Sequence, residues 1–175
     1  MSIVDLTSMG QPQIDLKNDI NNRLRKLQDE ISEYCYQCGK CTSGCEAHKL
    51  LELEPHKIVA LLKRGLIDEM VNSDVIWTCM SCFKCRERCP QKVPPVEILF
   101  ALKNMAVASG KPIPGKYSLM LQSILSIGLI QDIQTISKTD NNTINRNDLN
   151  LPDISKPVDS SKFQLVLSKI AIEKI

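Results

Sequence analysis

The stretches CYQCGKCTSGC (residues 35–45) and CMSCFKCRERCP (residues 79–90) decide how this chain folds. Each carries four cysteines with the spacing C-x2-C-x2-C-x3-C, and together they hold all eight cysteines of the 175 residues. Three thiols two residues apart wrap a tight loop, and a fourth thiol lies just beyond it. This spacing is typical of loops that hold a [4Fe–4S] cubane.

In such a run the fourth cysteine binds the cluster of the other motif. The three closely spaced thiolates hold three irons of one cube, and the fourth points the opposite way. The sequence therefore predicts two [4Fe–4S] clusters with crossed ligands. The first is assigned to Cys35, Cys38, Cys41 and Cys89, and the second to Cys79, Cys82, Cys85 and Cys45.

Two structural explanations compete with the clusters. Zinc also accepts four thiolates, but zinc sites usually use paired C-x2-C knuckles, which the repeated triplet does not match. Disulfides fit poorly because no secretory signal is visible, and a reducing cytosol, where we expect this chain, keeps thiols reduced. His48 and His56 are interpreted as ordinary residues, since eight cysteines already match eight ligand positions.

Bulk properties exclude two classes of partner. The formal net charge is +2 and no dense Lys/Arg run occurs, so nucleic acid is not expected. The longest apolar-rich stretch, residues 117–130, is interrupted by polar residues and is too short to span a bilayer. We therefore expect no membrane insertion.

Residues beside the cysteines leave several interpretations open. Glu46 follows Cys45 where Pro90 follows Cys89, and its charge is expected to lower the potential of the nearer cluster. Basic and aromatic residues also lie close by: Lys40, Lys84, Arg86, Arg88, Tyr34, Tyr36, Trp77 and Phe83. The cations could raise cluster potential, meet an acidic partner or simply be solvated. The rings could exclude water from the clusters or fill a small core.

The rest of the chain predicts helices and almost no strand. Apolar residues at Ile20, Leu24, Leu27 and Ile31 form one helical stripe starting from Asn18. Further helices are predicted from Pro55 to Gly65, over 66–71, from Pro94-Pro95 to Gly110, and over 117–130. Helix N-termini near the thiolates would offer N–H groups to the sulfurs. The fold class predicted is all-α, an α-helical ferredoxin with two cluster-binding loops between short helices.

The domain organisation follows from these patterns. Residues 1–17 are predicted to be an N-terminal arm, and 18–131 an α-helical dicluster ferredoxin domain. Residues 132–175 are predicted to be a linker and a C-terminal tail that docks on a partner. Within this tail, 163–175 could form a helix or a strand, and the pattern does not decide.

The stretches CYQCGKCTSGCEAHKL and VIWTCMSCFKCRERCPQKVPPVEILFALKNMAVASGKP resemble the C subunit of heterodisulfide reductase from methanogenic archaea. The resemblance covers about residues 20–130 and is strongest around the second motif. The same module is similar to cluster domains of succinate dehydrogenase, anaerobic glycerol-3-phosphate dehydrogenase and lactate-utilisation proteins. A free-standing chain without further catalytic domains favours the heterodisulfide reductase family.

This resemblance implies an electron relay within a cytoplasmic oxidoreductase complex. In the family, a flavin-containing A subunit supplies electrons and a catalytic B subunit reduces the coenzyme M–coenzyme B heterodisulfide of methanogenesis. A hydrogenase or formate dehydrogenase module lies further upstream. The chain itself is then expected to have no substrate site. The alternatives are a relay subunit of another such complex, or a structural or regulatory metal-binding protein.

Overall fold

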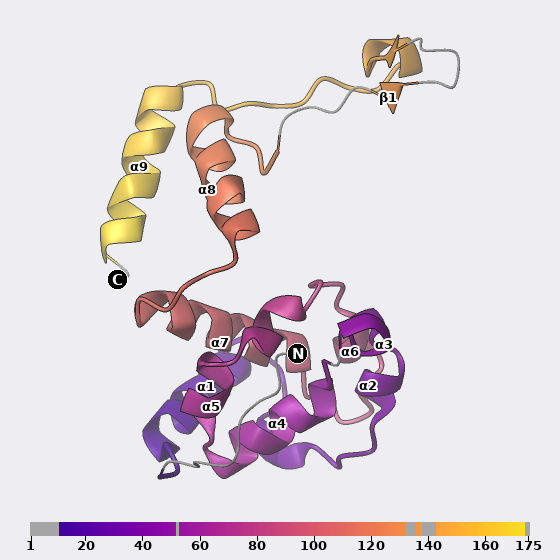
Figure 1. Ribbon diagram of the computed structural model, residues 1–175, viewed down its shortest axis with the longest axis vertical. Helices are drawn as coiled ribbons and strands as arrows, with labels where there is room; N and C mark the ends of the chain where they lie inside the picture. Colours follow the sequence, from indigo (N-terminus) through magenta and orange to yellow (C-terminus); the bar gives the residue numbers. More distant parts are fainter. Residues whose placement is uncertain (1–10, 52, 132–135, 138–142, 174–175) are drawn as a thin grey trace. The chain divides into compact units, whose positions relative to one another are not determined.

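The computed structural model describes residues 11–51, 53–131, 136–137 and 143–173. It divides into two compact units, Met1–Pro112 and Ile113–Ile175 (Figure 1). Helices dominate the described residues of both units, and their only sheet is one pair of two-residue strands. The all-α prediction is therefore confirmed.

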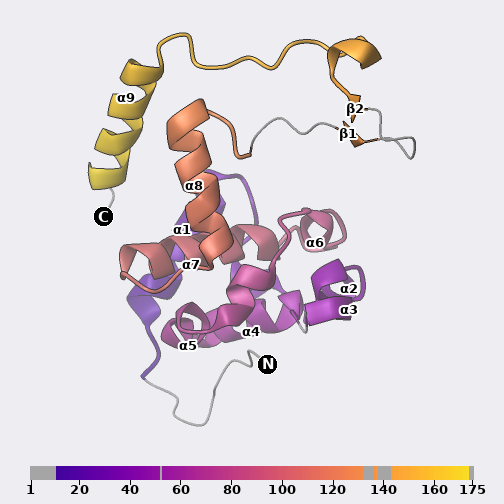
Figure 2. The same cartoon turned by 45° about the horizontal axis from the view of Figure 1, so that its top comes forward.

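The first unit contains both cysteine motifs and is built from short helices, with η denoting a 3-10 helix. In chain order these are α1 (Ile14–Lys26), η1 (Ser32–Tyr34), α2 (Lys40–Ser43), α3 (Glu46–Leu51), α4 (Pro55–Arg64), α5 (Ile67–Val71), η2 (Asp74–Thr78), α6 (Lys84–Glu87) and α7 (Pro95–Ala108). Figure 2 shows α2, α3 and α6 on one side of this unit, with α1 and α5 on the other.

Helix α4 begins and ends where the sequence predicts. Pro55 occupies its first turn, where a missing N–H costs nothing. Gly65 follows its last residue with a φ of 74°, and its N–H donates to the Leu62 carbonyl. Helix α7 likewise starts at Pro95, and Gly110 adopts a φ of 66° just beyond its end. Proline and glycine signals were thus reliable guides to both helices.

The predicted limits of α1 were wrong at both ends. The helix starts at Ile14 rather than Asn18 because Gln13 is fixed: its N–H donates to the Gly65 carbonyl at 2.8 Å. It stops at Lys26, and Gln28 takes a left-handed φ of 61°, so the predicted stripe ends early. Leu27 is 53% exposed, and Ile31 lies outside the helix. Residues 1–10 of the predicted arm lie outside the described residues.

The core of the first unit lies around α7, which contacts α1, α4, α5, α6 and η2. Its fully buried side chains come mainly from these helices: Ile20, Leu24, Val59, Leu62, Ile67, Met70, Ile76, Ile98, Leu99 and Leu102. Burying one Leu or Ile side chain stabilises a fold by about 2 kcal/mol. This apolar core gives the cysteine loops a rigid support.

The second unit consists of a helix pair and a small irregular segment. Helix α8 (Gly115–Ile127) packs beside α9 (Ser160–Glu173), and the Gln164 amide donates to the Leu125 carbonyl at 2.6 Å. Between these helices in the sequence come β1 (Ile136–Ser137), β2 (Thr143–Ile144) and η3 (Asn147–Leu149), and the two strands pair in antiparallel fashion. The open choice for the C-terminal stretch is thus resolved as a helix through residue 173.

The predicted cluster domain, residues 18–131, includes α8, whereas the structure groups α8 with α9 in the second compact unit. Compactness does not test which segments serve the clusters or a partner. The functional limits of the domains, including a docking role for 132–175, therefore stay predictions. None of the helices described is long and apolar enough to cross a membrane.

Candidate metal centre

The two cysteine loops share the same unusual backbone. Gln37 and Ser81, each just before the second cysteine of its motif, have φ values of 57° and 54°. Gly39 and Phe83, each just after that cysteine, have φ values of 74° and 60°. Left-handed backbone at non-glycine residues is uncommon. Its recurrence at matched positions shows that both loops curl in the same way.

The structural repeat extends well beyond the cysteine spacing, which was the only repeat the sequence revealed. A 3-10 helix precedes each loop, and the third cysteine lies in a short helix, α2 or α6. A proline-initiated helix follows, and each supplies a lysine to the first cysteine of its half. The Lys63 ammonium donates to the Cys35 carbonyl and the Lys103 ammonium to the Cys79 carbonyl, both at 3.3 Å.

One cysteine of the first motif joins three of the second around a single pocket. Cys45, Cys79, Cys82 and Cys85 all line it, together with apolar residues that include Leu53 and Leu99. This grouping is the same as the set that the sequence assigns to the second cluster. The pocket thus presents four sulfur atoms on an otherwise largely apolar wall.

Cys41 lies among the sulfurs of the other predicted set. Burial raises the pKa of the Cys41 thiol, and the neighbouring Cys35 and Cys89 sulfurs add to this rise. Cys89 belongs to the second motif, so a sulfur crosses between the motifs in this direction too. Cys38, the fourth member of this set, is exposed.

Two thiols of the second predicted set, those of Cys79 and Cys85, suit a cluster better than they suit water. Burial raises the pKa of Cys85 to about 12 and also raises that of Cys79. Iron binds cysteine as the thiolate, and its positive charge offsets the cost of burying that anion. All eight cysteines are free thiols, so none is consumed by a disulfide.

Backbone N–H groups are directed at several sulfurs, as the sequence predicts for helix N-termini. Val96, in the first turn of α7, donates to Cys85, and Thr42 in α2 donates to Cys41. Ser81 donates in the same way to Cys79. Such bonds stabilise thiolate charge. The donor set and its surroundings therefore fit [4Fe–4S] clusters.

Among the described residues, no three His, Cys, Asp or Glu side chains converge closely enough to hold one metal ion. A cubane does not need such convergence, because each thiolate binds a different iron. His56 does not join the sulfurs: its Nδ1 lies 2.7 Å from the Thr42 hydroxyl oxygen.

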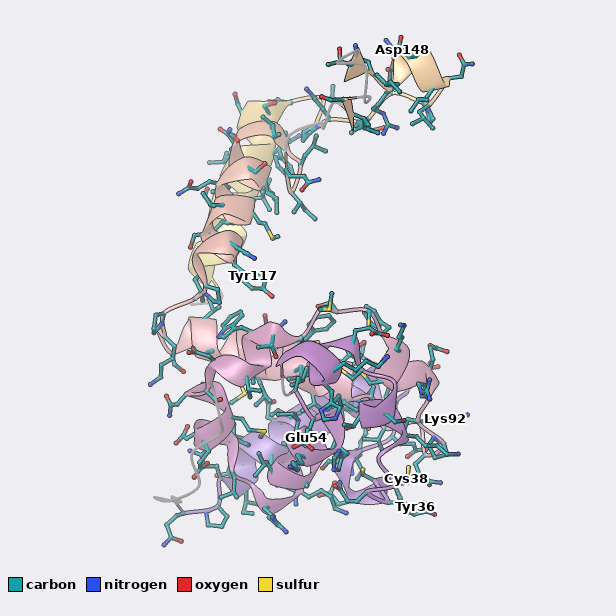
Figure 3. All side chains as sticks on the ribbon, turned by 45° about the vertical axis from the view of Figure 1, so that its right-hand side comes forward. Tyr36, Cys38, Glu54, Lys92, Tyr117 and Asp148 are labelled. Atoms are coloured by element: carbon teal, nitrogen blue, oxygen red, sulfur yellow. The ribbon has the colours of Figure 1, made fainter. Side chains whose placement is uncertain are left out.

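Each predicted cluster has one edge that faces solvent. The second cysteine of each motif, Cys38 or Cys82, is the exposed one. The residue two positions earlier is exposed as well, Tyr36 by 72% and Met80 by 63%. Figure 3 shows Tyr36 and Cys38 beside each other at one edge of the first unit. The repeat thus exposes the same corner of both loops.

The two arginines of the second motif have intramolecular partners. The Arg86 guanidinium lies 2.9 Å from the Asp29 carboxylate and 3.0 Å from that of Glu97. Arg88 donates to the Lys40 carbonyl at 3.2 Å and lies against Gly44. These contacts join the two motifs to each other and to the helical core, a role that the sequence did not suggest.

Glu46 also has partners, which bears on its predicted effect. Its carboxylate lies 3.0 Å from Lys84 and 3.3 Å from Lys49. Hydrogen bonds from Lys84 and then Lys49 hold the pKa of Glu46 below its ordinary value. Part of its negative charge is therefore compensated by the second motif itself.

The aromatic residues do not act as one group. Phe83 lines the pocket and meets Phe100 edge to face, with ring centroids 5.9 Å apart. Trp77 packs against the main core, whereas Tyr34 and Tyr36 are largely exposed. Trp77 therefore fills the core, whereas Phe83 lines the pocket and stays 40% exposed.

Comparison with known proteins also indicates 4Fe-4S clusters for this region. Residues 31–93 match the family model described as a 4Fe-4S dicluster domain. The iron–sulfur C subunit of CoB–CoM heterodisulfide reductase from Methanopyrus kandleri is 35% identical over 104 residues, which cover 55% of this chain and 54% of that protein. A C subunit of the same enzyme from Methanocaldococcus jannaschii, numbered 2, is 40% identical over 76 residues, 43% of this chain and 40% of the relative.

A third relative is the C subunit of the H(2):CoB-CoM heterodisulfide,ferredoxin reductase of Methanothermobacter thermautotrophicus. It is 29% identical over 96 residues, 55% of this chain and 52% of that protein. The chain spans about half the length of the curated relatives it matches. Residues 31–93 are thus similar to a 4Fe-4S dicluster domain, and about half of the chain is similar to the C subunits of heterodisulfide reductases.

Proposed function

We propose that this chain is an electron-transfer subunit that relays single electrons through two [4Fe–4S] clusters. The observation that carries the proposal is the grouping of sulfurs across the motifs. Cys45 shares a pocket with Cys79, Cys82 and Cys85, while Cys41 lies near Cys35 and Cys89. This grouping supports crossed ligation, in which each motif gives three ligands to one cluster and one to the other.

The spacing of the two sulfur sets favours transfer between them. Cys41 and Cys85, the third cysteines of the motifs, pack with Val96 in one small buried cluster of residues. The Cys41 and Cys45 sulfurs both contribute to the raised pKa of the Cys85 thiol. This packing of two buried cysteines supports two cluster sites that adjoin inside the protein. Cubanes held there would supply one-electron chemistry at two adjacent points.

The exposed corners suggest where electrons enter and leave. Cys38 and Cys82 face solvent in their separate loops, so each cluster has its own contact edge. An exposed ligand at each cluster supports a relay, because a donor and an acceptor must both approach the clusters.

The relatives suggest which complex the relay serves. We propose that the donor is a flavin-containing A subunit and the acceptor a catalytic B subunit that reduces the coenzyme M–coenzyme B heterodisulfide, in the cytoplasm. A hydrogenase or formate dehydrogenase module would feed the complex. All eight cysteines serve as cluster ligands in this proposal, so no thiol remains to attack a disulfide. The chain would lack a substrate site.

The test is the metal and sulfide content of the full chain, purified anaerobically, with its electron paramagnetic resonance spectrum after dithionite reduction. Two cubanes predict about eight irons and eight acid-labile sulfides per chain. The spectrum should show two interacting reduced clusters. Stoichiometric zinc without sulfide or signal would contradict the relay and leave a structural or regulatory metal protein.

Serine variants of single cysteines test the crossed ligands in the same spectra. Cys45→Ser and Cys82→Ser should alter the signal of one cluster, and Cys38→Ser that of the other. If Cys45→Ser and Cys38→Ser instead alter the same signal, the first motif holds its own cluster and the assignment is wrong. In that case the chain still holds two clusters, but each motif supplies all four ligands of its own cluster.

A further inference from the structure

Lys103 is a buried cation beside the second cysteine loop. It comes from α7 and is only 7% exposed, whereas lysine side chains are almost never fully buried without a partner. Its ammonium donates to the Cys79 carbonyl at 3.3 Å and lies 5.9 Å from the ring centroids of both Trp77 and Phe100. The positive charge of Lys103 therefore lies against the backbone of Cys79, a predicted cluster ligand.

Lys63 provides a natural comparison within the same molecule. It comes from α4 and donates to the Cys35 carbonyl at the same distance, 3.3 Å. Lys63 is only partly buried, however, while Lys103 lies in the core. The two lysines therefore offer the same charge at matched positions of the repeat, in environments of different polarity.

The electrostatic consequence has a definite sign. A cubane with four thiolates carries about −2 when oxidised and about −3 when reduced. A nearby positive charge favours the reduced form and raises the reduction potential. This attraction is several times stronger in the interior than in water, because the effective dielectric constant is lower. Lys103 should thus act more strongly on its cluster than Lys63 does.

We propose that Lys103 raises the reduction potential of the cluster held by Cys79, Cys82, Cys85 and Cys45, more than Lys63 raises that of the other. The inference rests on the proposed function, since it needs both clusters. This difference would contribute to unequal reduction potentials of the two clusters of the relay. The apolar pocket wall, with Leu53 and Leu99, acts in the opposite direction, and Lys103 offsets it.

The contact geometry supports this role, because the Lys103 ammonium donates to the carbonyl of Cys79, which is itself assigned as a cluster ligand. Glu46, which the sequence assigns a lowering effect on the nearer cluster, is compensated in part by Lys84 and Lys49.

The experiment is an anaerobic redox titration of the full chain followed by electron paramagnetic resonance. Wild type is compared with Lys103→Met, Lys103→Arg and Lys63→Met, after each has been shown to hold its iron. Lys103→Met should lower the midpoint potential of one cluster by about 59 mV. For a one-electron couple, this is about a tenfold fall in the equilibrium constant for reduction. Lys103→Arg keeps the positive charge, so its midpoint potentials should stay close to those of wild type. Lys63→Met should lower the other potential by less.

The outcomes separate this inference from the proposed function. Wild type without iron and sulfide overturns both. Full clusters with unchanged potentials in Lys103→Met overturn only the role of Lys103. An equal fall in Lys103→Arg would assign the effect to packing rather than charge and would also overturn it. If Lys103→Met does not hold iron, Lys103→Gln removes the charge while keeping a donor for the Cys79 carbonyl, and the same criteria apply.

Discussion

At the scale of single residues, Arg86 connects three separate parts of the first unit. It projects from α6 toward Asp29, which follows α1, and Glu97, in the first turn of α7. The Asp29 side chain is 7% exposed and that of Glu97 17%. Two carboxylates in such positions need a cation, because a buried unpaired charge is costly. Arg86 therefore secures the second motif to the core.

Replacing Arg86 by Met should lower the free energy of unfolding by about 2–3 kcal/mol, because Asp29 is left as a buried charge without its partner. Arg88→Met is the matched control. It follows the same helix and loses only a bond to the Lys40 carbonyl, so a loss of about 1 kcal/mol or less is expected. Anaerobic urea titrations, followed by circular dichroism, measure both. Equal losses would show that the pair with Asp29 adds nothing special.

The cysteine spacing gave a hypothesis for the ligands but no indication of the residues that support them. The structure groups Cys45 with Cys79, Cys82 and Cys85, as in the predicted second set, and the assignment of ligands to clusters stays a prediction. Lys63 and Lys103 follow the first cysteine of their motif at different intervals, which hides their equivalence. Arg86 lies in a run of charges that looks like a solvated surface. Only the fold brings these cations to their carbonyl and carboxylate partners.

At the scale of secondary structure, local signals were most informative where a residue restricts the backbone. Pro55 and Gly65 delimit α4 because proline favours a first turn and glycine tolerates a left-handed φ. The end of α1 had no such signal: Gln28 adopts a left-handed φ although it is not a glycine. Contacts of Gln13 with the Gly65–Asp68 turn also set its start. Tertiary bonds of this kind are invisible to periodicity.

Gly128 gives a test of the α8–α9 pair. It ends α8 with a φ of 75°, and a Cβ atom there would lie 2.5 Å from Pro157 Cδ, in a rigid ring that cannot move away. Gly128→Ala should therefore destabilise the pair by about 1–2 kcal/mol from backbone strain, and by more from the clash. Amide hydrogen exchange in α9 should accelerate about tenfold or more.

Gly115→Ala is the matched control for this experiment. Gly115 starts the same helix, its φ is not positive, and nothing lies within 4 Å of an added Cβ. Alanine there should leave exchange in α9 unchanged or slow it slightly, since it reduces the freedom of the unfolded chain. If both variants behave alike, the close contact of Gly128 with Pro157 does not hold the pair together.

At the scale of the whole molecule, burial and chemistry are concentrated in the first unit. Every buried apolar residue among those described lies between Ile20 and Ala106, as do all eight cysteines. Helix α8 buries no residue completely, and leaves Leu119 and Leu121 more than half exposed. The core that supports the cysteine loops is therefore built from residues of the first unit.

A chain ending at Pro112 should consequently retain both clusters. Its core, including Leu99 and Leu102 of α7, is complete, so about eight irons and eight sulfides per chain and an unchanged paramagnetic spectrum are expected. A chain ending at Val93 is the control, because it lacks α7 and the Val96 N–H that donates to Cys85; it should not hold stable clusters. Loss of iron from the longer fragment would show that residues beyond Pro112 help to build the cluster domain, as the predicted limit at residue 131 requires of α8.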